Sequence, residues 1–416
     1  MKTLGSIVTY QKGKPPKVGP HGRLPVLSPH YLRTGQIEDM AEPTSKDVVL
    51  KGGELILLWD GSNAGEFFRA RAGVLSSTMV AFDFDEEETN PDYLYYDLKR
   101  FEPELKGRTA GSGIPHVDKE VLLARQVFDG GPDEQKAAAK VLLRVDLAIE
   151  QTEALLAKQQ RIKMGLMHNL LTRGLDAQGR LRDPSTHKFK PSRLGLIPDG
   201  WEVESLEQLL AKVPNAMRSG PFGSALLKAE LAKSGSPLLG IDNVFVERFV
   251  TDYSRFVGDE KFEDLKRYAV RPLDVMITIM GTVGRCCVVP EDIGKALSSK
   301  HTWTISFDLE RYSPYVACWQ INHAEWILRQ LRRDEQGGVM SSIQSSTLRS
   351  LLFPVPNPDE MKEIERLYLT QNRWIEETAA LLPKLRRLKS GLMHDLLSGS
   401  VSVTPLFATP KARISS

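Results

Sequence analysis

The feature that most constrains this chain is a helical segment that occurs twice. The stretch RIKMGLMHNLLTRG, residues 161–174, returns near the C-terminus as RLKSGLMHDLLSGS, residues 387–400. When residues 132–171 are laid over residues 358–397 without a gap, about half of the positions are identical. Internal repetition of this kind predicts one structural unit that is built twice.

Each copy has the pattern of one long amphipathic helix that ends near a glycine. At 1.5 Å per residue, a helix of roughly 40 residues is about 60 Å long, too long to bury its apolar stripe inside a small domain. We therefore expect the two copies to pack against each other as a coiled coil, with a kink at Pro383. The predicted seam residues are Val145, Leu155, Ile162 and Leu166 in the first copy, and Trp374, Leu381, Leu385, Leu388 and Leu392 in the second.

The segments before each helix are also related. GGELILLWDG, residues 52–61, resembles PLDVMITIMG, residues 272–281, and GVLSSTMVAFDF, residues 73–84, resembles KALSSKHTWTISFDL, residues 295–309. Short β-branched runs broken by glycines predict a β-rich α/β module. The expected fold class is therefore α+β, with two similar modules, two long helices and a pseudo-twofold internal repeat.

This repeat predicts the domain boundaries. The expected order is a first module at 1–130, a long helix at 131–174, a linker at 175–200, a second module at 201–356, a second long helix at 357–400 and a tail at 401–416. The linker is inferred from its glycines, prolines and serines.

Composition limits the classes of protein that fit. The three cysteines, Cys286, Cys287 and Cys318, form no CxxC pair, and we interpret them as small buried hydrophobic residues. The sequence contains no signal-like apolar core and no run of about 18 apolar residues, so no membrane contact is expected. These features predict a soluble, cytoplasmic protein.

Motifs for catalysis are missing from the sequence, which contains no GxxxxGK[ST], HExxH or GxSxG. Asp92, Asp97 and Lys99 imitate a nuclease cluster, but the second module has no matching carboxylate. His168 and His394 recur in GLMH, where a polar seam or a subunit contact is a simpler interpretation than a metal site. We expect no enzyme activity, metal or cofactor in this chain.

Taken together, LKSGLMHDLLSG, its first copy IKMGLMHNLLTRG and the segment GPFGSALL at the entry to the second module resemble the DNA specificity (S) subunit of Type I restriction-modification systems. The resemblance covers nearly the whole chain. It implies two target recognition domains, each reading one half of an asymmetric bipartite sequence in double-stranded DNA. It also implies that two antiparallel helices dock two modification (methyltransferase) subunits, which bring S-adenosylmethionine, while restriction subunits join for translocation and cleavage.

Polar loops at matched positions of the two modules are the candidates for DNA contact, because Lys and Arg hold phosphates while Arg, Asn and Gln can read base edges. The DNA-binding candidates are Lys12, Lys14, Arg33, Gln36, Thr78, Ser112 and His116 in the first module, and Arg218, Ser219, Asn243, Lys300, His301, Ser342 and Gln344 in the second. Two alternatives remain at this point: a coiled-coil scaffold that binds proteins without DNA, and a self-contained enzyme.

Overall fold

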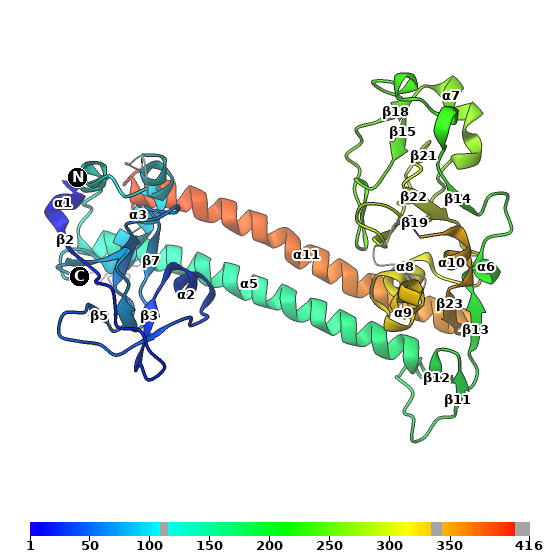
Figure 1. Cartoon of the computed structure of the whole chain (residues 1–416), viewed down its shortest axis with the longest axis horizontal. Coiled ribbons are helices and arrows are strands. Elements are labelled where there is room, and N and C mark those ends of the chain that lie inside the picture. Colours follow the sequence, from blue (N-terminus) through cyan, green and yellow to red (C-terminus); the bar gives the residue numbers. More distant parts are fainter. Residues whose placement is uncertain (109–114, 334–342, 404–416) are drawn as a thin grey trace, which may run out of the picture. The chain divides into compact units, whose positions relative to one another are not determined.

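The computed structural model describes residues 1–108, 115–333 and 343–403. The chain divides into two compact units. Unit 1 comprises Met1–Leu155 and Thr378–Ser416, and unit 2 comprises Leu156–Glu377. Each unit contains one module and one end of each long helix (Figure 1).

The two long helices are α5, Pro132–Thr172, and α11, Pro358–Leu397. Both begin with proline at a position where a missing backbone donor costs nothing, followed by acidic residues that favour a helix N-terminus. Gly174 and Gly399 adopt the left-handed conformation just beyond the two C-termini. The second helix is continuous through Pro383. The α+β class with two long helices is therefore confirmed.

Ion pairs show that the helices run in opposite directions within unit 1. Asp146 of α5 lies 2.6 Å from Lys389 of α11, and Glu153 lies 2.7 Å from Arg386, so a later residue of α5 meets an earlier residue of α11 (Figure 1). In unit 2 the Lys163 ammonium of α5 lies 4.9 Å from the ring centroid of Tyr368 on α11.

Five of the nine residues predicted for the helix seam are exposed, so the prediction is wrong for them. The exposed fractions are 48% for Leu155, 49% for Ile162, 54% for Trp374, 48% for Leu381 and 51% for Leu388. Their neighbours Leu156, Lys163, Ile375, Leu382 and Lys389 are the more buried residues. Because one residue turns a helix by about 100°, a shift of one position moves a side chain from the seam to an outer face. Val145, Leu166, Leu385 and Leu392 are partly buried.

The first module contains two four-stranded sheets. In spatial order, one sheet consists of β2 (Val8–Lys12), β9 (Met79–Phe84), β6 (Leu55–Leu58) and β7 (Phe67–Arg69). The other consists of β4 (Met40–Ala41), β3 (Leu24–Leu27), β8 (Gly73–Leu75) and β5 (Val49–Leu50). The short strands β1 (Lys2–Thr3) and β10 (Gln126–Val127) pair separately.

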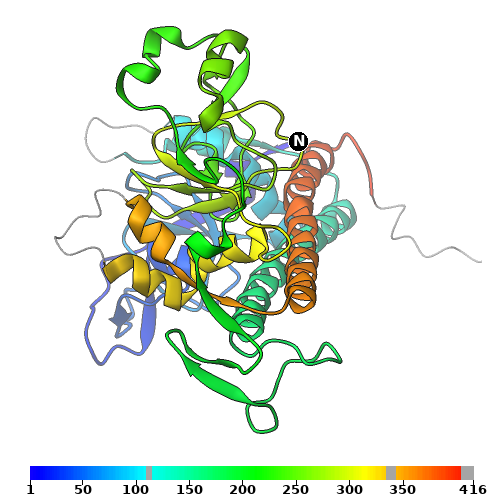
Figure 2. The same cartoon turned by 90° about the vertical axis from the view of Figure 1, so that its right-hand side faces the viewer.

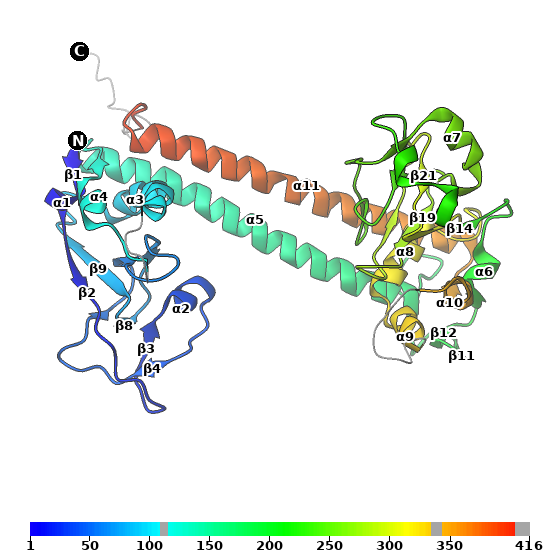
Figure 3. The same cartoon turned by 45° about the horizontal axis from the view of Figure 1, so that its top comes forward.

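Helices pack on the sheets of the first module, and three of them share a core with the long-helix ends of unit 1 (Figure 3). The helices of this module are α1 (Leu4–Ile7), α2 (Pro29–Thr34), α3 (Pro91–Gly107) and α4 (Lys119–Ala124). The core places Leu94 and Leu98 of α3 with Leu142 of α5 and Leu396 of α11. Burial of these apolar side chains is the main force that holds the helix ends to the module.

The second module repeats the topology of the first. One sheet has the order β14 (Met217–Ser219), β22 (Thr302–Ile305), β19 (Val275–Thr278) and β20 (Cys286–Val288). A second sheet has the order β18 (Phe256–Val257), β15 (Ser236–Leu239) and β21 (Leu297–Ser298). In both modules one pair is parallel, with Val26 opposite Val74 in the first and Leu238 opposite Leu297 in the second.

The remaining elements complete unit 2. They are the pairs β13 (Glu202–Ser205) with β23 (Leu352–Val355) and β16 (Val244–Phe245) with β17 (Arg248–Phe249), the α-helices α6 (Leu206–Leu209), α7 (Asp259–Asp264), α8 (Pro314–His323), α9 (Glu325–Arg333) and α10 (Ser345–Ser350), and the 3-10 helices η1 (Gly223–Ala225), η2 (Lys228–Glu230) and η3 (Lys266–Tyr268). All three cysteines are buried, as predicted.

The segment predicted as a linker has structure of its own. Residues 175–200 contain a hairpin of β11 (Phe189–Ser192) and β12 (Gly195–Pro198) at the edge of unit 2 (Figure 2). Leu175 and Ile197 are buried in the core of unit 2, so this segment packs on the unit rather than only connecting parts of the chain. Among the helices of the described residues, none is long and apolar enough to span a membrane.

Candidate nucleic-acid interface

Three of the predicted DNA contacts are structural residues instead. Arg218 is 4% exposed and pairs with buried Asp274, and it also donates a hydrogen bond to the hydroxyl of Ser306 at 3.0 Å. Asn243 is 2% exposed, and its amide binds the backbone at Gly240 and Val250. Ser219 is also buried. The prediction that these three residues contact DNA is therefore wrong, because side chains held inside the module cannot reach a base edge.

Other candidates gather around a small concavity in unit 2. Lys300 and His301 line it together with Ser299, and Arg255 enters from the residue before β18. The remaining lining residues are Pro221, Gly223, Leu226 and Leu238. The sequence pointed to Lys300 and His301 but not to Arg255, since a single arginine at the start of a short strand carries no local signal.

Unit 1 brings Lys12, Thr78 and His116 together around Asp60. The Lys12 ammonium lies 2.6 Å from the Asp60 carboxylate, the Asp60 amide donates to the Thr78 carbonyl at 3.2 Å, and Asp60 forms a β-bridge with His116. Beside them, Tyr10 stacks on Trp59 with ring centroids 5.2 Å apart. Lys12 is thus partly neutralised by an acid, which weakens its attraction for phosphate.

The remaining candidates do not join either group. Lys14 and Gln36 are exposed, and Arg33 pairs with Glu66. Gln344 is exposed at the N-cap of α10. Ser112 and Ser342 lie outside the described residues.

The cluster suspected of nuclease chemistry is divided among separate ion pairs. Asp97 is buried and accepts two hydrogen bonds from Arg125, at 2.8 and 3.2 Å. Asp92 pairs with Arg69, and Lys99 pairs with Glu102 at 2.6 Å. The three side chains therefore do not converge on one point.

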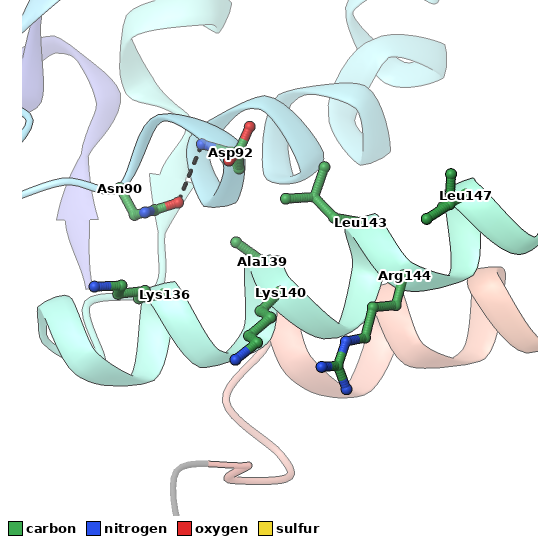
Figure 4. A pocket seen from close by; sticks show the side chains of 8 residues that line it. All are labelled: Asn90, Asp92, Lys136, Ala139, Lys140, Leu143, Arg144 and Leu147. Carbon is green, nitrogen blue, oxygen red and sulfur yellow. Dashed lines mark hydrogen bonds between the residues drawn. The ribbon is translucent and has the colours of Figure 1, made fainter. Parts of the chain in front are cut away.

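A groove of about 460 Å³ runs along α5 beside the start of α3 in unit 1 (Figure 4). Leu143 and Leu147 line it and are 44% and 51% exposed. Lys136, Lys140 and Arg144, spaced four residues apart, follow the same helix. An exposed apolar groove beside basic residues is typical of a protein-binding surface.

A buried charge network that the sequence did not reveal joins the second module to both helices in unit 2. Glu247, in the turn between β16 and β17, accepts hydrogen bonds from Lys163 at 2.7 and 2.9 Å and from the Tyr368 hydroxyl at 2.8 Å, while His323 lies at 3.3 Å. Burial alone would raise the pKa of Glu247, but the His323 hydrogen bond and the Lys163 charge lower it to about 2. Its left-handed backbone, with φ of 54°, is unusual for glutamate.

Comparisons with known proteins agree with this architecture. Residues 1–159 match the family described as Type I restriction modification DNA specificity domain. The Type I restriction enzyme MjaVIII specificity subunit of Methanocaldococcus jannaschii is 27% identical over 412 residues, which cover 97% of this chain and 93% of the relative. The EcoBI specificity subunit of Escherichia coli is 21% identical over 367 residues, covering 84% of this chain and 74% of the relative.

A solved structure shares the fold. The S subunit of a type I restriction-modification system from M. genitalium superposes with a TM-score of 0.58 and 14% identity, covering 95% of both chains. Nearly the whole chain is similar in sequence to specificity subunits of type I restriction enzymes, and residues 1–159 match the DNA specificity domain of that family.

Proposed function

We propose that this chain is the DNA-recognition subunit of a type I restriction-modification complex and is itself non-catalytic. Its two modules, residues 1–130 and 201–356, each bind one block of an asymmetric bipartite target in double-stranded DNA. Two modification subunits dock on the chain and methylate adenine, and restriction subunits complete the complex. Because the substrate is cellular DNA, the proposed location is the cytoplasm.

The main support for this proposal is that the two modules share the same sheet arrangement but carry different polar side chains in their loops. The sheet orders β2-β9-β6-β7 and β14-β22-β19-β20 correspond strand by strand. At the same place in this frame, the backbone donates to the Thr78 carbonyl in unit 1 and to the His301 carbonyl in unit 2. Two modules with the same backbone arrangement and different polar loops would each fit a half-site of different base sequence.

The groove on α5 supports the proposed docking of a modification subunit. Leu143 and Leu147 expose apolar surface that a partner would remove from water, and basic residues flank them. Lys136 and Arg144 form no ion pair within residues 1–108, 115–333 and 343–403, so they are available to an acidic partner surface.

Sequencing of methylated adenine in host DNA tests the function. With the chain present, we expect methylation within two unlike short blocks separated by a spacer of fixed length, and we expect this methylation to disappear when the gene is deleted. The purified chain alone should transfer no methyl group, since a modification subunit supplies the pocket for the flipped base. Unchanged methylation after deletion, with no salt-dependent DNA binding by the assembled complex, would instead favour a protein-interaction scaffold.

A further inference from the structure

The concavity of unit 2 is formed by a close approach of two loops. Gly220, which follows β14, lies so near the loop after β21 that a Cβ atom there would be 2.1 Å from the Ser298 carbonyl oxygen and 2.6 Å from the Lys300 nitrogen. Only glycine permits this approach. It places the loop that contains Pro221 and Gly223 against Ser299, Lys300 and His301, and encloses a volume of about 140 Å³.

Two cationic side chains, Arg255 and Lys300, line this concavity. The Nε of Arg255 is buried and has no hydrogen-bond partner, although the same guanidinium pairs with Asp242 through its NH2 group. An unpaired buried donor is unfavourable, so the Arg255 side chain would be stabilised by an acceptor that enters the concavity. Lys300 is exposed and forms no ion pair among the described residues, which leaves its charge uncompensated beside the Arg255–Asp242 pair.

The pKa of His301 is also affected by the positive charges at this concavity. Burial lowers the pKa of His301, and the charges of Lys300 and Arg255 lower it further. Because Asp242 partly neutralises Arg255, the uncompensated positive charge at the concavity is that of Lys300, and this charge can attract one anionic group. Its volume is well below the roughly 300 Å³ of the smallest usual ligand pockets, so one small group suits it better than a whole nucleotide.

We propose that this concavity holds one phosphate group of the DNA backbone, bound by Lys300 and Arg255. This assignment rests on the proposed DNA-binding function. Charged donors surrounding a small volume match phosphate oxygens, and such contacts position a protein on the duplex without reading sequence. The pocket would therefore fix the register of the second module while other loops read its bases.

The first module lacks the corresponding cations. The backbone of Val26 donates to the Asp39 carbonyl in the way that Leu238 donates to the Arg255 carbonyl, so an acid stands in unit 1 where the arginine stands in unit 2. The loop that corresponds to residues 298–301 contains Ser76, Ser77 and Thr78 and no basic residue. The phosphate contact thus belongs to the second module, and the two modules hold the DNA backbone differently.

Salt-dependent binding tests the assignment without knowledge of the target. The full complex of this chain with its modification subunits is titrated with a fluorescent duplex of random sequence at several salt concentrations. For Lys300→Gln, we expect the slope of log K against log salt to become shallower by about 0.9, with roughly three- to tenfold weaker binding at 0.15 M salt. Lys300→Arg should keep the wild-type slope, because it keeps the charge.

Lys266→Gln is the matched control, since Lys266 is 68% exposed in the same unit, pairs with Glu263 and does not line the concavity. Circular dichroism should show that all variants are folded, as expected for exposed positions. If the wild type shows salt-dependent binding and Lys300→Gln has the same slope, the phosphate site is wrong while the proposed function stands. If a parallel titration with several duplexes of defined sequence shows that Lys300→Gln changes only the preference among them, the side chain reads a base and the phosphate assignment fails. If the wild-type complex itself shows no salt-dependent binding, the proposed function fails first.

Discussion

In each unit, a lysine, a carboxylate and a tyrosine attach the module to the long helices, but the carboxylate and the tyrosine come from different elements in the two units. In unit 2 a lysine of α5, Lys163, meets a carboxylate from the module, Glu247, beside a tyrosine of α11. In unit 1 the repeat-related lysine of α11, Lys389, meets a carboxylate of α5, Asp146, beside a tyrosine from the module, Tyr96. The lysine occupies the repeat-related position in both units. The carboxylate comes from the module in unit 2 and from a long helix in unit 1, and the tyrosine comes from a long helix in unit 2 and from the module in unit 1.

The two anchors also differ in burial. The side chains of Lys163 and Glu247 are 9% and 15% exposed, whereas those of Lys389 and Asp146 are 29% and 35% exposed. Removing one partner from a buried pair leaves an uncompensated charge, which is far more costly than losing a pair in contact with water. Unit 2 should therefore depend on its anchor more strongly than unit 1.

The largest expected effect comes from Glu247→Ala. It leaves Lys163 buried without a carboxylate, and we expect unit 2 to lose about 3–5 kcal/mol of unfolding free energy. Urea denaturation followed by tryptophan fluorescence measures the change. Loss of less than 1 kcal/mol would show that the buried pair does not hold the module to the helices.

Acid should weaken the same anchor. The folded pKa of Glu247, about 2, lies below its ordinary value of 4.5, so its contribution is complete above about pH 4.5 and is lost as pH falls towards 2. The lowered pKa corresponds to roughly 3 kcal/mol. The difference in unfolding free energy between wild type and Glu247→Gln, measured from pH 6 to pH 2.5, should shrink over this window. A constant difference would contradict the lowered pKa.

The groove on α5 offers a comparison between the helix copies. At the positions matching Leu143 and Leu147, α11 has Leu369, which is partly buried, and Arg373. Leu143→Asp with Leu147→Asp should weaken docking of one modification subunit by roughly 2 kcal/mol, about thirtyfold. Native mass spectrometry should then show complexes with one modification subunit. Leu309→Asp, at a leucine that is 55% exposed in unit 2, is the control. Full occupancy in the double variant would rule out this groove as a docking surface.

The smallest effect is expected for the more exposed anchor. Asp146→Asn removes the charge that faces Lys389 and weakens the acceptor of the Tyr96 hydroxyl hydrogen bond, which measures 2.6 Å. We expect unit 1 to lose about 1 kcal/mol. The same denaturation assay applies, and a loss as large as that of Glu247→Ala would remove the distinction between the two anchors.

These contrasts show which parts of the molecule could be predicted from the sequence. The long helices and the doubled module follow from periodicity and self-similarity, both of which are local patterns. The seam prediction failed at Trp374, Leu381 and Leu388 because periodicity alone did not separate these exposed apolar residues from buried ones, and Lys389 takes a more buried position than Leu388.

Sites that depend on distant partners were beyond the sequence. The sequence around Lys163 does not indicate Glu247, and the sequence around Arg218 does not indicate Asp274. These carboxylates neutralise the two cations, which allows both side chains to be buried. Lys300 and His301 were singled out because they lie in a polar loop, but their grouping with Arg255 depends on how β18 and β21 flank β15. Local sequence patterns predict which residues lie in loops, but the tertiary contacts of each side chain determine whether it remains free to bind a ligand.

Exchange of one module tests the central claim most directly. Residues 1–130 are replaced by the first module of a relative with a different target, and methylated adenines are mapped in cells that express the hybrid chain with its modification subunits. We predict that one block of the target changes while the other block and the spacer length stay the same, because the second module and both long helices are unaltered. A change in both blocks, or in neither, would contradict the account of two independent DNA-reading modules on one repeated frame.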